Sequence, residues 1–486
     1  MIVLKFGGTS VGDVGRVREA AAIVEGQPRP RVAVVSAVGG VTNLLLEAAR
    51  AAGARDAARA ETVSALVRER HLGVAAGIGD DEERMAALAE LDQLHAALED
   101  ALADVLTAGE LTHRDSDRIV ATGEKAMSVL MAATLRARGT PAVHVFADRV
   151  IATDGRHGAA RPDRPRTRQQ AQAVICPMLE AGLTVVVTGF IGGAPDGATT
   201  TLGRGGSDYT ATLLGAALDA DEVQIWTDVP GVLSADPRQV PDARVVAQIS
   251  YDEAQELAHF GAKVLHPRTI RPAVARNIPV RILSTFAPRQ PGTLVTREEE
   301  VPGGEGLKAV TALRGLLLLA VDVPELEDLA GASAKVFGVL AEDGIEVLSV
   351  SQASSRRRMT YLVDAGGHGG CARVGSRLAG ALDGADFEVE VACTQDVAVV
   401  AAVGAGAAAR PATLSRVLDV LAGANVPVLS ASQQESNVAL VAAVPAADVD
   451  RAVRALHDAF IRSHAANARN RRPRRQELLA ESVRVG

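Results

Sequence analysis

The chain has 486 residues, 48% of them hydrophobic and 2% aromatic, so we expect two or more domains with cores built from Ala, Val and Leu. A formal net charge of −8 argues against general nucleic-acid binding, and no apolar run is long enough to span a bilayer. Three widely separated cysteines, Cys176, Cys371 and Cys393, show neither a disulfide nor a metal pattern, and no secretory leader is recognisable. These features predict a reducing, cytoplasmic setting without membrane partners.

The first 285 residues or so alternate Val/Ile-rich runs with helical patterns. Buried strands are predicted at 2–6, 31–37, 142–146, 183–190, 222–228 and 279–283. Helical patterns such as 13–24 and 117–139 lie between them, and 51–110 predicts a helical excursion with little β signal. This alternation predicts an α/β fold with a mostly parallel sheet covered by helices on both faces. The breakers and charges of 286–306 then mark a domain boundary.

The last third contains an internal repeat. Residues 335–355 align without gaps on 416–436, at an offset of 81 residues, with 10 of 21 positions identical. Each copy predicts a helix, a turn, a strand and a polar S-x-S-Q-type stretch, so two small α+β modules should pack side by side. The run 313–323 is long and apolar and predicts a buried strand, while the basic tail 466–486 is expected to be disordered.

The first predicted strand runs directly into Lys5 and the pair Gly7-Gly8. Backbone amides at such a glycine turn can form a nest for phosphate oxygens, with the lysine ammonium alongside. The stretch matches neither a Walker A motif nor a G-x-G-x-x-G fingerprint. Taken alone, it is explained equally well by a plain tight turn.

Four further stretches place polar residues where predicted strands end. They are "SAVGGVTNLL" with Thr42, "TLGRGGSDYTA" with Arg204, Ser207 and Asp208, "IWTDVPGVLSADPR" with Thr227, Asp228 and Arg238, and "FGAKVLHPRTI" with Lys263. Each alone could be a turn, a helix cap or a solvated lysine. Together they favour a ligand site at the carboxyl ends of the strands, where open α/β sheets bind their ligands.

The motifs K-F-G-G-T-S-V, G-R-G-G-S-D-Y, T-D-V-P-G with D-P-R, and F-G-A-K-V-L-H-P resemble those of aspartate kinases of the amino-acid kinase fold, over roughly residues 1–462. The repeated modules resemble the paired ACT domains of that family. The Gln-containing stretches are most similar to the threonine-sensitive kinase halves of aspartokinase–homoserine dehydrogenases, with no dehydrogenase half expected here. The resemblance implies a catalytic domain at 1–290, ACT modules at 307–390 and 391–465, and the tail at 466–486.

The resemblance also implies a reaction. The chain would transfer the ATP γ-phosphoryl, with Mg²⁺, to the side-chain carboxylate of L-aspartate, giving 4-phospho-L-aspartate in the first step of lysine, threonine and methionine biosynthesis. No catalytic base is needed, because a carboxylate with a pKa near ~3.9 is already ionised at neutral pH. The implied roles are catalysis by Lys5 and Asp208, substrate binding by Thr42, Glu124, Arg204 and Ser207, and nucleotide binding by Lys5, Gly7, Gly8, Thr227, Asp228, Arg238 and Lys263, with no protein-held metal.

Glu124 has a second interpretation, because a lone glutamate on a helix is usually solvated. The chain also departs from the family pattern in two places. Leu233 stands where the family often has a tyrosine near the adenine, and Arg356 to Arg358 follow the first Gln-containing stretch, where an acidic residue is usual.

The resemblance further implies feedback inhibition by an amino acid, threonine rather than lysine, at Gln352 and Gln433, which the repeat places at equivalent positions. Such modules imply a homodimer or a higher homo-oligomer. Two other functions remain open: a kinase of the same fold acting on another carboxylate or a carbamate, and a non-catalytic amino-acid sensor.

Overall fold

The computed structural model describes nine stretches of the chain and divides it into two compact units. The described residues are 1–262, 266–297, 306–322, 329–353, 358–366, 370–382, 390–405, 410–433 and 437–462. The first unit comprises 1–232, 245–255 and 263–300, and the second comprises 233–244, 256–262 and 301–486. Two short segments of the predicted 1–290 domain therefore belong to the second unit. The basic tail beyond residue 462 lies outside the described residues.

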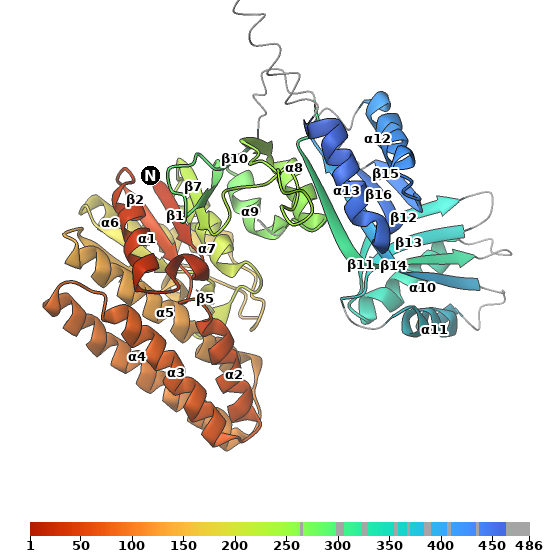
Figure 1. Ribbon diagram of the computed structural model, residues 1–486. Helices are drawn as coiled ribbons and strands as arrows, with labels where there is room; N and C mark the ends of the chain where they lie inside the picture. Colours follow the sequence, from red (N-terminus) through yellow and green to blue (C-terminus); the bar gives the residue numbers. More distant parts are fainter. Residues whose placement is uncertain are drawn as a thin grey trace, which may run out of the picture. The chain divides into compact units, whose positions relative to one another are not determined.

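The first unit is built on an eight-stranded sheet in the order β3-β4-β2-β1-β7-β9-β10-β8 (Figure 1). Neighbours from β3 to β9 are parallel, and β10 is antiparallel to β9 but parallel to β8. All six predicted strands are present, so the predicted mostly parallel sheet is confirmed. The strands are β1 (Ile2–Phe6), β2 (Arg31–Val35), β3 (Ala142–Val145), β4 (Thr184–Thr188), β7 (Glu222–Thr227), β8 (Gln248–Ser250), β9 (Val280–Ser284) and β10 (Thr293–Thr296).

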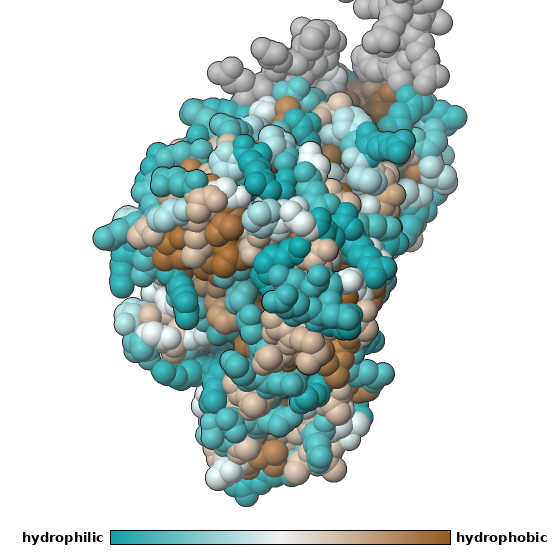
Figure 2. Space-filling model, turned by 90° about the vertical axis from the view of Figure 1, so that its left-hand side faces the viewer, coloured by the Kyte–Doolittle hydropathy of each residue, from teal (hydrophilic) through white to brown (hydrophobic). Residues whose placement is uncertain are grey.

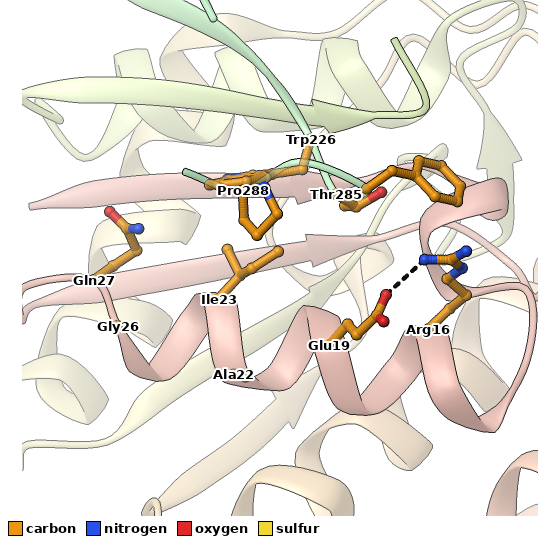
Figure 3. Close-up of a pocket in the computed structure, with 10 residues that line it drawn as sticks. Arg16, Glu19, Ala22, Ile23, Gly26, Gln27, Trp226, Thr285 and Pro288 are labelled. Carbon is orange, nitrogen blue, oxygen red and sulfur yellow. Dashed lines mark hydrogen bonds and ion pairs between the residues drawn. The ribbon is translucent and has the colours of Figure 1, made fainter. Parts of the chain in front are cut away.

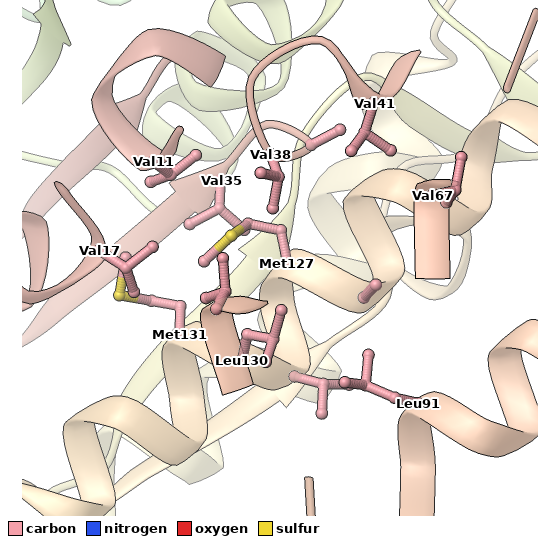
Figure 4. Packing of buried hydrophobic residues seen from close by; sticks show 14 of the residues in the cluster. Val11, Val17, Val35, Val38, Val41, Val67, Leu91, Met127, Leu130 and Met131 are labelled. Carbon is pink, nitrogen blue, oxygen red and sulfur yellow. The ribbon is translucent and has the colours of Figure 1, made fainter. Parts of the chain in front are cut away.

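Alternation along β1 directs its side chains to two different faces of the sheet. Leu4 and Phe6 join a core with α1 (Val14–Glu25) and α5 (His113–Ala137). In this core Met127, Leu130 and Met131 of α5 lie close to valines of α1 and β2 (Figure 4). Lys5 therefore points to the other face, where α7 (Gly206–Ala217) contacts β1, β2 and β7.

The helical excursion predicted for 51–110 is confirmed as two helices, α3 (Ala57–Ala75) and α4 (Asp81–Ala108), which follow α2 (Val41–Gly53). Local caps set their limits: Asp56 and Asp80 accept backbone N–H groups at the starts of α3 and α4. A capping box of Thr112 and Asp115 begins α5. The unit also contains α6 (Arg164–Glu180), α9 (Pro267–Val274) and the hairpin of β5 (Ile191–Gly193) and β6 (Thr199–Thr201). Helix α8 (Tyr251–His259) begins in the first unit and ends in the second.

The second unit contains a six-stranded antiparallel sheet in the order β12-β13-β11-β14-β16-β15. The two halves of this order mirror each other about the central β11–β14 pair. The 81-residue offset of the sequence repeat also relates β11 to β14 and β13 to β16. The elements are β11 (Ala309–Asp322), α10 (Leu329–Glu342), β12 (Glu346–Ala353), β13 (Arg358–Asp364), α11 (Cys371–Leu382), β14 (Glu390–Val403), α12 (Pro411–Gly423), β15 (Ser430–Gln433), β16 (Ala439–Pro445) and α13 (Val449–His457).

The cysteine interpretation is wrong in one respect. Cys371, at the start of α11, is joined to Cys393 of β14 by a disulfide, and Cys176 is free. The two residues are 22 positions apart, and only the packing of α11 against β14 brings their Cα atoms to 5.4 Å. The cysteines therefore do not support a reducing compartment.

One face of the molecule is mixed in polarity. On the face shown in Figure 2, apolar residues form separate patches bordered by hydrophilic residues. Within the described ranges, no helix combines the length and the hydrophobicity needed to cross a bilayer.

Candidate active site

A cavity of about 580 Å³ lies in the first unit, at the carboxyl ends of β1 and β2. Its walls are the glycine turns after these strands, one side of α5, and the loop that leads into α7. It brings together seven of the predicted site residues: Lys5, Gly8, Thr42, Glu124, Arg204, Ser207 and Asp208. Residues more than 200 positions apart thus share one site, as expected for a sheet of this type.

Lys5 and Asp208 form an ion pair on the floor of this cavity. Lys5 Nζ lies 2.6 Å from Asp208 Oδ1, and the two side chains are only 11% and 18% exposed. Asp208 lies in the first turn of α7, where the helix dipole favours a negative charge. The Asp208 carboxylate therefore holds the Lys5 ammonium beside the glycine turn that follows β1.

The turn after β1 packs tightly against the turn after β2. A Cβ atom on Gly8 would lie 3.2 Å from the carbonyl oxygen of Ala37, and one on Gly39 would lie 3.2 Å from the carbonyl oxygen of Gly8. A side chain at either position would push the neighbouring backbone away by a few tenths of an ångström, so glycine favours this close approach. The Gly7 amide differs from the prediction, because it donates to the carbonyl oxygen of Trp226 at 3.3 Å. Within the predicted nest, Gly8 is the residue that lines the cavity.

Glu124 is buried in the cavity wall, with 3% of its surface exposed, so the solvated-helix interpretation is wrong. Its Oε1 accepts a hydrogen bond from the Ala37 amide at 3.3 Å, while its Oε2 has no hydrogen-bond partner in the described part of the chain. Burial raises the pKa of Glu124 to about 8. An unsatisfied buried carboxyl oxygen facing a cavity is costly unless a ligand supplies a donor.

Arg204 stands in a turn of glycines that leads into α7. Gly203 and Gly205 have φ values of +76° and +66°, a conformation that residues with a Cβ rarely adopt. Arg204 is exposed and makes no hydrogen bond or ion pair with any residue that the structure describes. A free guanidinium at the rim of a cavity can bind a carboxylate in a bidentate manner.

Thr42 and Ser207 each lie in the first turn of a helix, α2 and α7 respectively. Both hydroxyl residues line the cavity and are partly buried. The backbone of Gly189 packs closely against Ser207, since a Cβ atom on Gly189 would lie 2.5 Å from Ser207 Oγ. Small polar residues at helix N-termini suit an anionic ligand.

The predicted nucleotide residues are not all placed together. Thr227 ends β7 between the ends of β1 and β9, and its Oγ1 donates to Asp228 Oδ1 at 3.1 Å. Arg238 belongs to the second unit, where it is exposed and paired with Asp236 at 2.5 Å. Lys263 lies outside the described residues.

The predicted effector residues Gln352 and Gln433 lie on β12 and β15, the outer strands of the six-stranded sheet. Both side chains are exposed, and Gln433 Nε2 donates to Asn437 Oδ1 at 2.8 Å. Of the three arginines after the first Gln-containing stretch, Arg358 pairs with Asp322 at 2.6 Å. Arg356 and Arg357 lie outside the described residues.

The cavity also contains residues that the sequence analysis did not assign. Gly158 comes from the loop between β3 and α6, and Phe190 follows β4 with an unusual φ of +69°. The signal that could have found Gly158 is a glycine within an otherwise Arg/Pro-rich loop. Phe190 had no comparable signal, because its strained backbone is visible only in the structure.

A second cavity of about 420 Å³ shares no residue with the predicted site. It lies between α1 and the segment that follows β9, where Ile23 and Glu19 of α1 face Trp226, Thr285 and Pro288 (Figure 3). Its Glu19 is already paired with Arg16 at 2.7 Å. The charged groups of this cavity therefore satisfy each other, in contrast to Glu124 and Arg204 of the first cavity.

Comparisons with known proteins agree with this geometry. Residues 1–284 match the amino acid kinase family, and residues 400–460 match an ACT domain. Lysine-sensitive aspartokinase 3 of Escherichia coli is 40% identical over 353 residues, which cover 71% of this chain and 75% of that protein. The bifunctional aspartokinase/homoserine dehydrogenase of Daucus carota is 32% identical over 465 residues, covering 94% of this chain but 50% of its own length.

Solved structures give the same result. E. coli aspartokinase III in complex with aspartate and ADP (R-state) superposes with a TM-score of 0.78 and 32% identity, covering 94% of this chain and 99% of that one. The same enzyme in complex with lysine and aspartate (T-state) gives 0.78 and 31%, covering 95% and 99%. The chain spans about half the length of the bifunctional relatives that it matches.

Proposed function

We propose, because this chain belongs to the aspartokinases of the amino acid kinase family, that it transfers the γ-phosphoryl group of ATP to the side-chain carboxylate of L-aspartate. The product would be 4-phospho-L-aspartate. One observation carries the proposal: a single cavity is lined by the Lys5–Asp208 ion pair, by Glu124 with its unsatisfied carboxyl oxygen, and by Arg204, which has no ion-pair partner among the described residues. The name of the E. coli enzyme's complex, with aspartate and ADP, supports the same pair of ligands.

Substrate binding follows from charge. Aspartate carries an α-ammonium, an α-carboxylate and a reacting carboxylate. Arg204 binds the α-carboxylate, and Glu124 accepts hydrogen bonds from the α-ammonium through its free Oε2. Thr42 and Ser207 donate hydrogen bonds to the substrate from their hydroxyl groups. These contacts direct the side-chain carboxylate toward Lys5.

The phosphoryl end of the cavity must bring two anions together. Lys5 and the backbone of Gly8 stabilise negative charge on the group being transferred, and Asp208 holds Lys5 in place. The attacking carboxylate needs no base, because its pKa near ~3.9 leaves it ionised at neutral pH. Thr227, the last residue of β7, and Asp228 after it form part of the nucleotide site beside the end of β1.

Mg²⁺ would arrive with the nucleotide and be held mainly by the substrate phosphates. Asp208, which pairs with Lys5 in the cavity, would support these metal-bound phosphates. When bound, the ion would neutralise charge on the phosphate oxygens.

We further propose that an amino acid made downstream inhibits the chain through Gln352 and Gln433. The amide side chains can both donate to and accept from the head group of an amino acid. We place threonine before lysine because of the Gln-containing pattern, and the name of the 40% identical relative makes lysine the direct competitor. The two glutamines lie on the two outer strands of the sheet, at equivalent positions of the sequence repeat.

Oligomerisation through the second unit belongs to the same proposal. In the described part of the chain, β12 and β15 each pair on one side only, with β13 and β16. Open edges of this kind are templates for pairing with another chain. A homodimer or a larger homo-oligomer is therefore expected, and cytoplasmic location remains an expectation from the sequence.

The decisive experiment is phosphoryl transfer with hydroxylamine present, because an acyl phosphate is trapped as a hydroxamate. Formation of a hydroxamate that requires both ATP and L-aspartate is the expected result. Succinate, which lacks the ammonium group, should react poorly because Glu124 then has no cation to bind. Equal reaction with succinate or a carbamate would favour another acceptor, and aspartate binding without turnover would favour a sensor.

A further inference from the structure

Asp117 is a buried carboxylate that the predicted site does not include. It lies on α5 with 2% of its surface exposed. Glu124 follows it by seven residues, about two helical turns, so the two carboxylates lie on the same side of α5. A carboxylate is rarely so buried without a specific set of donors.

Three donors from two different segments surround Asp117. Its Oδ2 accepts hydrogen bonds from His157 Nδ1 and from the Gly158 amide, both at 2.9 Å. Its Oδ1 accepts one from Thr201 Oγ1 at 2.6 Å. A single side chain on a long, buried helix thus fixes both the 157–158 loop and the end of β6.

Both segments belong to the wall of the active-site cavity. Gly158 lines it directly, and Thr201 stands three residues before Arg204, which also lines it. The two segments touch each other as well: a Cβ on Gly203 would lie 3.6 Å from the carbonyl oxygen of Gly158. The Ala160 amide also donates to the carbonyl oxygen of Thr201 at 2.8 Å.

Arg204 depends on this arrangement for its position. Its guanidinium makes no hydrogen bond or ion pair with any described residue, so the backbone of the 203–205 turn determines where it lies. We infer that Asp117 is a positioning residue for substrate: through Thr201 and Gly158 it sets the place of Arg204 and hence the affinity for the α-carboxylate of aspartate. This inference rests on the proposed function.

Two matched threonine variants test it. Thr201→Val removes the hydroxyl bonded to Asp117 while keeping the shape of the side chain. Thr167→Val does the same at an equally buried threonine that does not line the cavity. The Oγ1 of Thr167 accepts a hydrogen bond from the Ala152 amide at 3.1 Å. We expect Thr201→Val to raise the aspartate KM about fivefold to tenfold, because small misplacements of binding groups are costly. Thr167→Val should keep the aspartate KM of the unmodified chain.

Variants of Asp117 itself extend the test. In Asp117→Asn, the amide oxygen can still accept from His157 and Gly158, and the amide nitrogen can donate to the Thr201 hydroxyl. This variant should stay within about threefold of the wild-type aspartate KM, whereas Asp117→Ala should raise it about tenfold or more with little change in the ATP KM. If Asp117→Ala does not fold, the comparison of Thr201→Val with Thr167→Val still tests the positioning role.

The outcomes distinguish a failure of the positioning role of Asp117 from a failure of the proposed function. Equal aspartate KM values in Thr201→Val and Thr167→Val overturn the positioning role while leaving the proposed function intact. An ATP KM that rises as much as the aspartate KM in Asp117→Ala overturns it too. A wild-type chain that neither turns over nor binds L-aspartate in calorimetry overturns the proposed function, and with it this inference, before any variant is made.

Discussion

Lys5 and Glu124 in the first unit are buried and held by Asp208 and the Ala37 amide, whereas Gln352 and Gln433 in the second unit are exposed on outer strands. The first sheet is mostly parallel, so several strand ends and helix N-termini meet at one edge. The second sheet is antiparallel and mirrored about β11 and β14, which places its two Gln-bearing strands, β12 and β15, at the outer edges of the sheet.

This difference indicates what each unit can do alone. A site whose charged groups are fixed by the fold is pre-organised for the transition state of a reaction. An exposed amide at the end of an edge strand gains binding strength only when a ligand or a second chain covers it. We therefore expect substitutions in the first unit to have large effects on turnover, and substitutions in the second unit to have modest effects on regulation.

The largest effect should come from Lys5→Ala. Removing the cation that faces the transferred group should lower kcat by about 1,000-fold or more, since one positioned charge can contribute several kcal/mol. Lys5→Arg should rescue little, because its planar fork differs from an ammonium. Steady-state kinetics with circular dichroism measures both activity and folding.

Lys125→Ala is the matched control for this change. Lys125 forms an ion pair of similar burial with Asp148 at 2.8 Å but does not line the cavity. It should keep kcat within a few-fold of wild type. If Lys5→Ala behaves like Lys125→Ala, the contrast between the units no longer rests on a catalytic lysine.

Arg204→Ala should have the next largest effect. Loss of the guanidinium should raise the aspartate KM about 10- to 100-fold, as for a lost charge-assisted hydrogen bond, with little change in ATP affinity. Calorimetry with each ligand separates the two. A collapse of ATP affinity with an unchanged aspartate KM would assign this arginine to the nucleotide.

Glu124→Gln should change the pH dependence of substrate binding. Because the pKa of Glu124 is raised to about 8 by burial, the free site is mostly protonated at neutral pH and must ionise to bind an ammonium. The wild-type aspartate KM should therefore fall as the pH rises from 7 to about 8.5. The glutamine variant should have a KM about tenfold higher that lacks this change.

Glu124→Gln should also change how stability depends on pH: rising pH improves substrate binding by the wild-type chain but lowers its free energy of unfolding. Between the ordinary value of 4.5 and about 8, the folded state keeps a proton on Glu124 that the unfolded state releases. The free energy of unfolding should therefore fall with rising pH, by at most about 1.4 kcal/mol per pH unit from this group. Denaturant unfolding of wild type and Glu124→Gln at pH 5 and pH 8 measures the difference, and identical pH slopes would contradict a buried, protonated glutamate.

The smallest effects should come from Gln352→Ala and Gln433→Ala. Each should weaken inhibition by threonine or lysine about fivefold, at the lower end of the usual range of coupling between sites, and leave uninhibited kcat unchanged. Titration of each amino acid, alone and together, gives the inhibition constants. Full inhibition in both variants would remove the glutamines from the effector sites, and an uninhibited wild type would remove the regulatory role.

The sequence by itself determined the elements and the kinds of residue at their ends. Periodicity was sufficient for the six strands of the first unit, for the helical excursion and for the 81-residue repeat, because each of these is encoded locally. Glycines beside Lys5 and Arg204 marked the turns, because such turns restrict which residues can occupy them. The roles of those residues came from the family resemblance.

Only the tertiary structure decided which of these residues meet and what surrounds them. The burial of Glu124 and its raised pKa, the engagement of the Gly7 amide by Trp226, and the disulfide between Cys371 and Cys393 all depend on partners far away in the sequence or on packing around the residue. Asp117 is the clearest case, because nothing local distinguishes it from a solvated helix aspartate. Its three donors lie 40 to 84 residues away, and only the packing of α5 against the loops brings them within hydrogen-bonding distance.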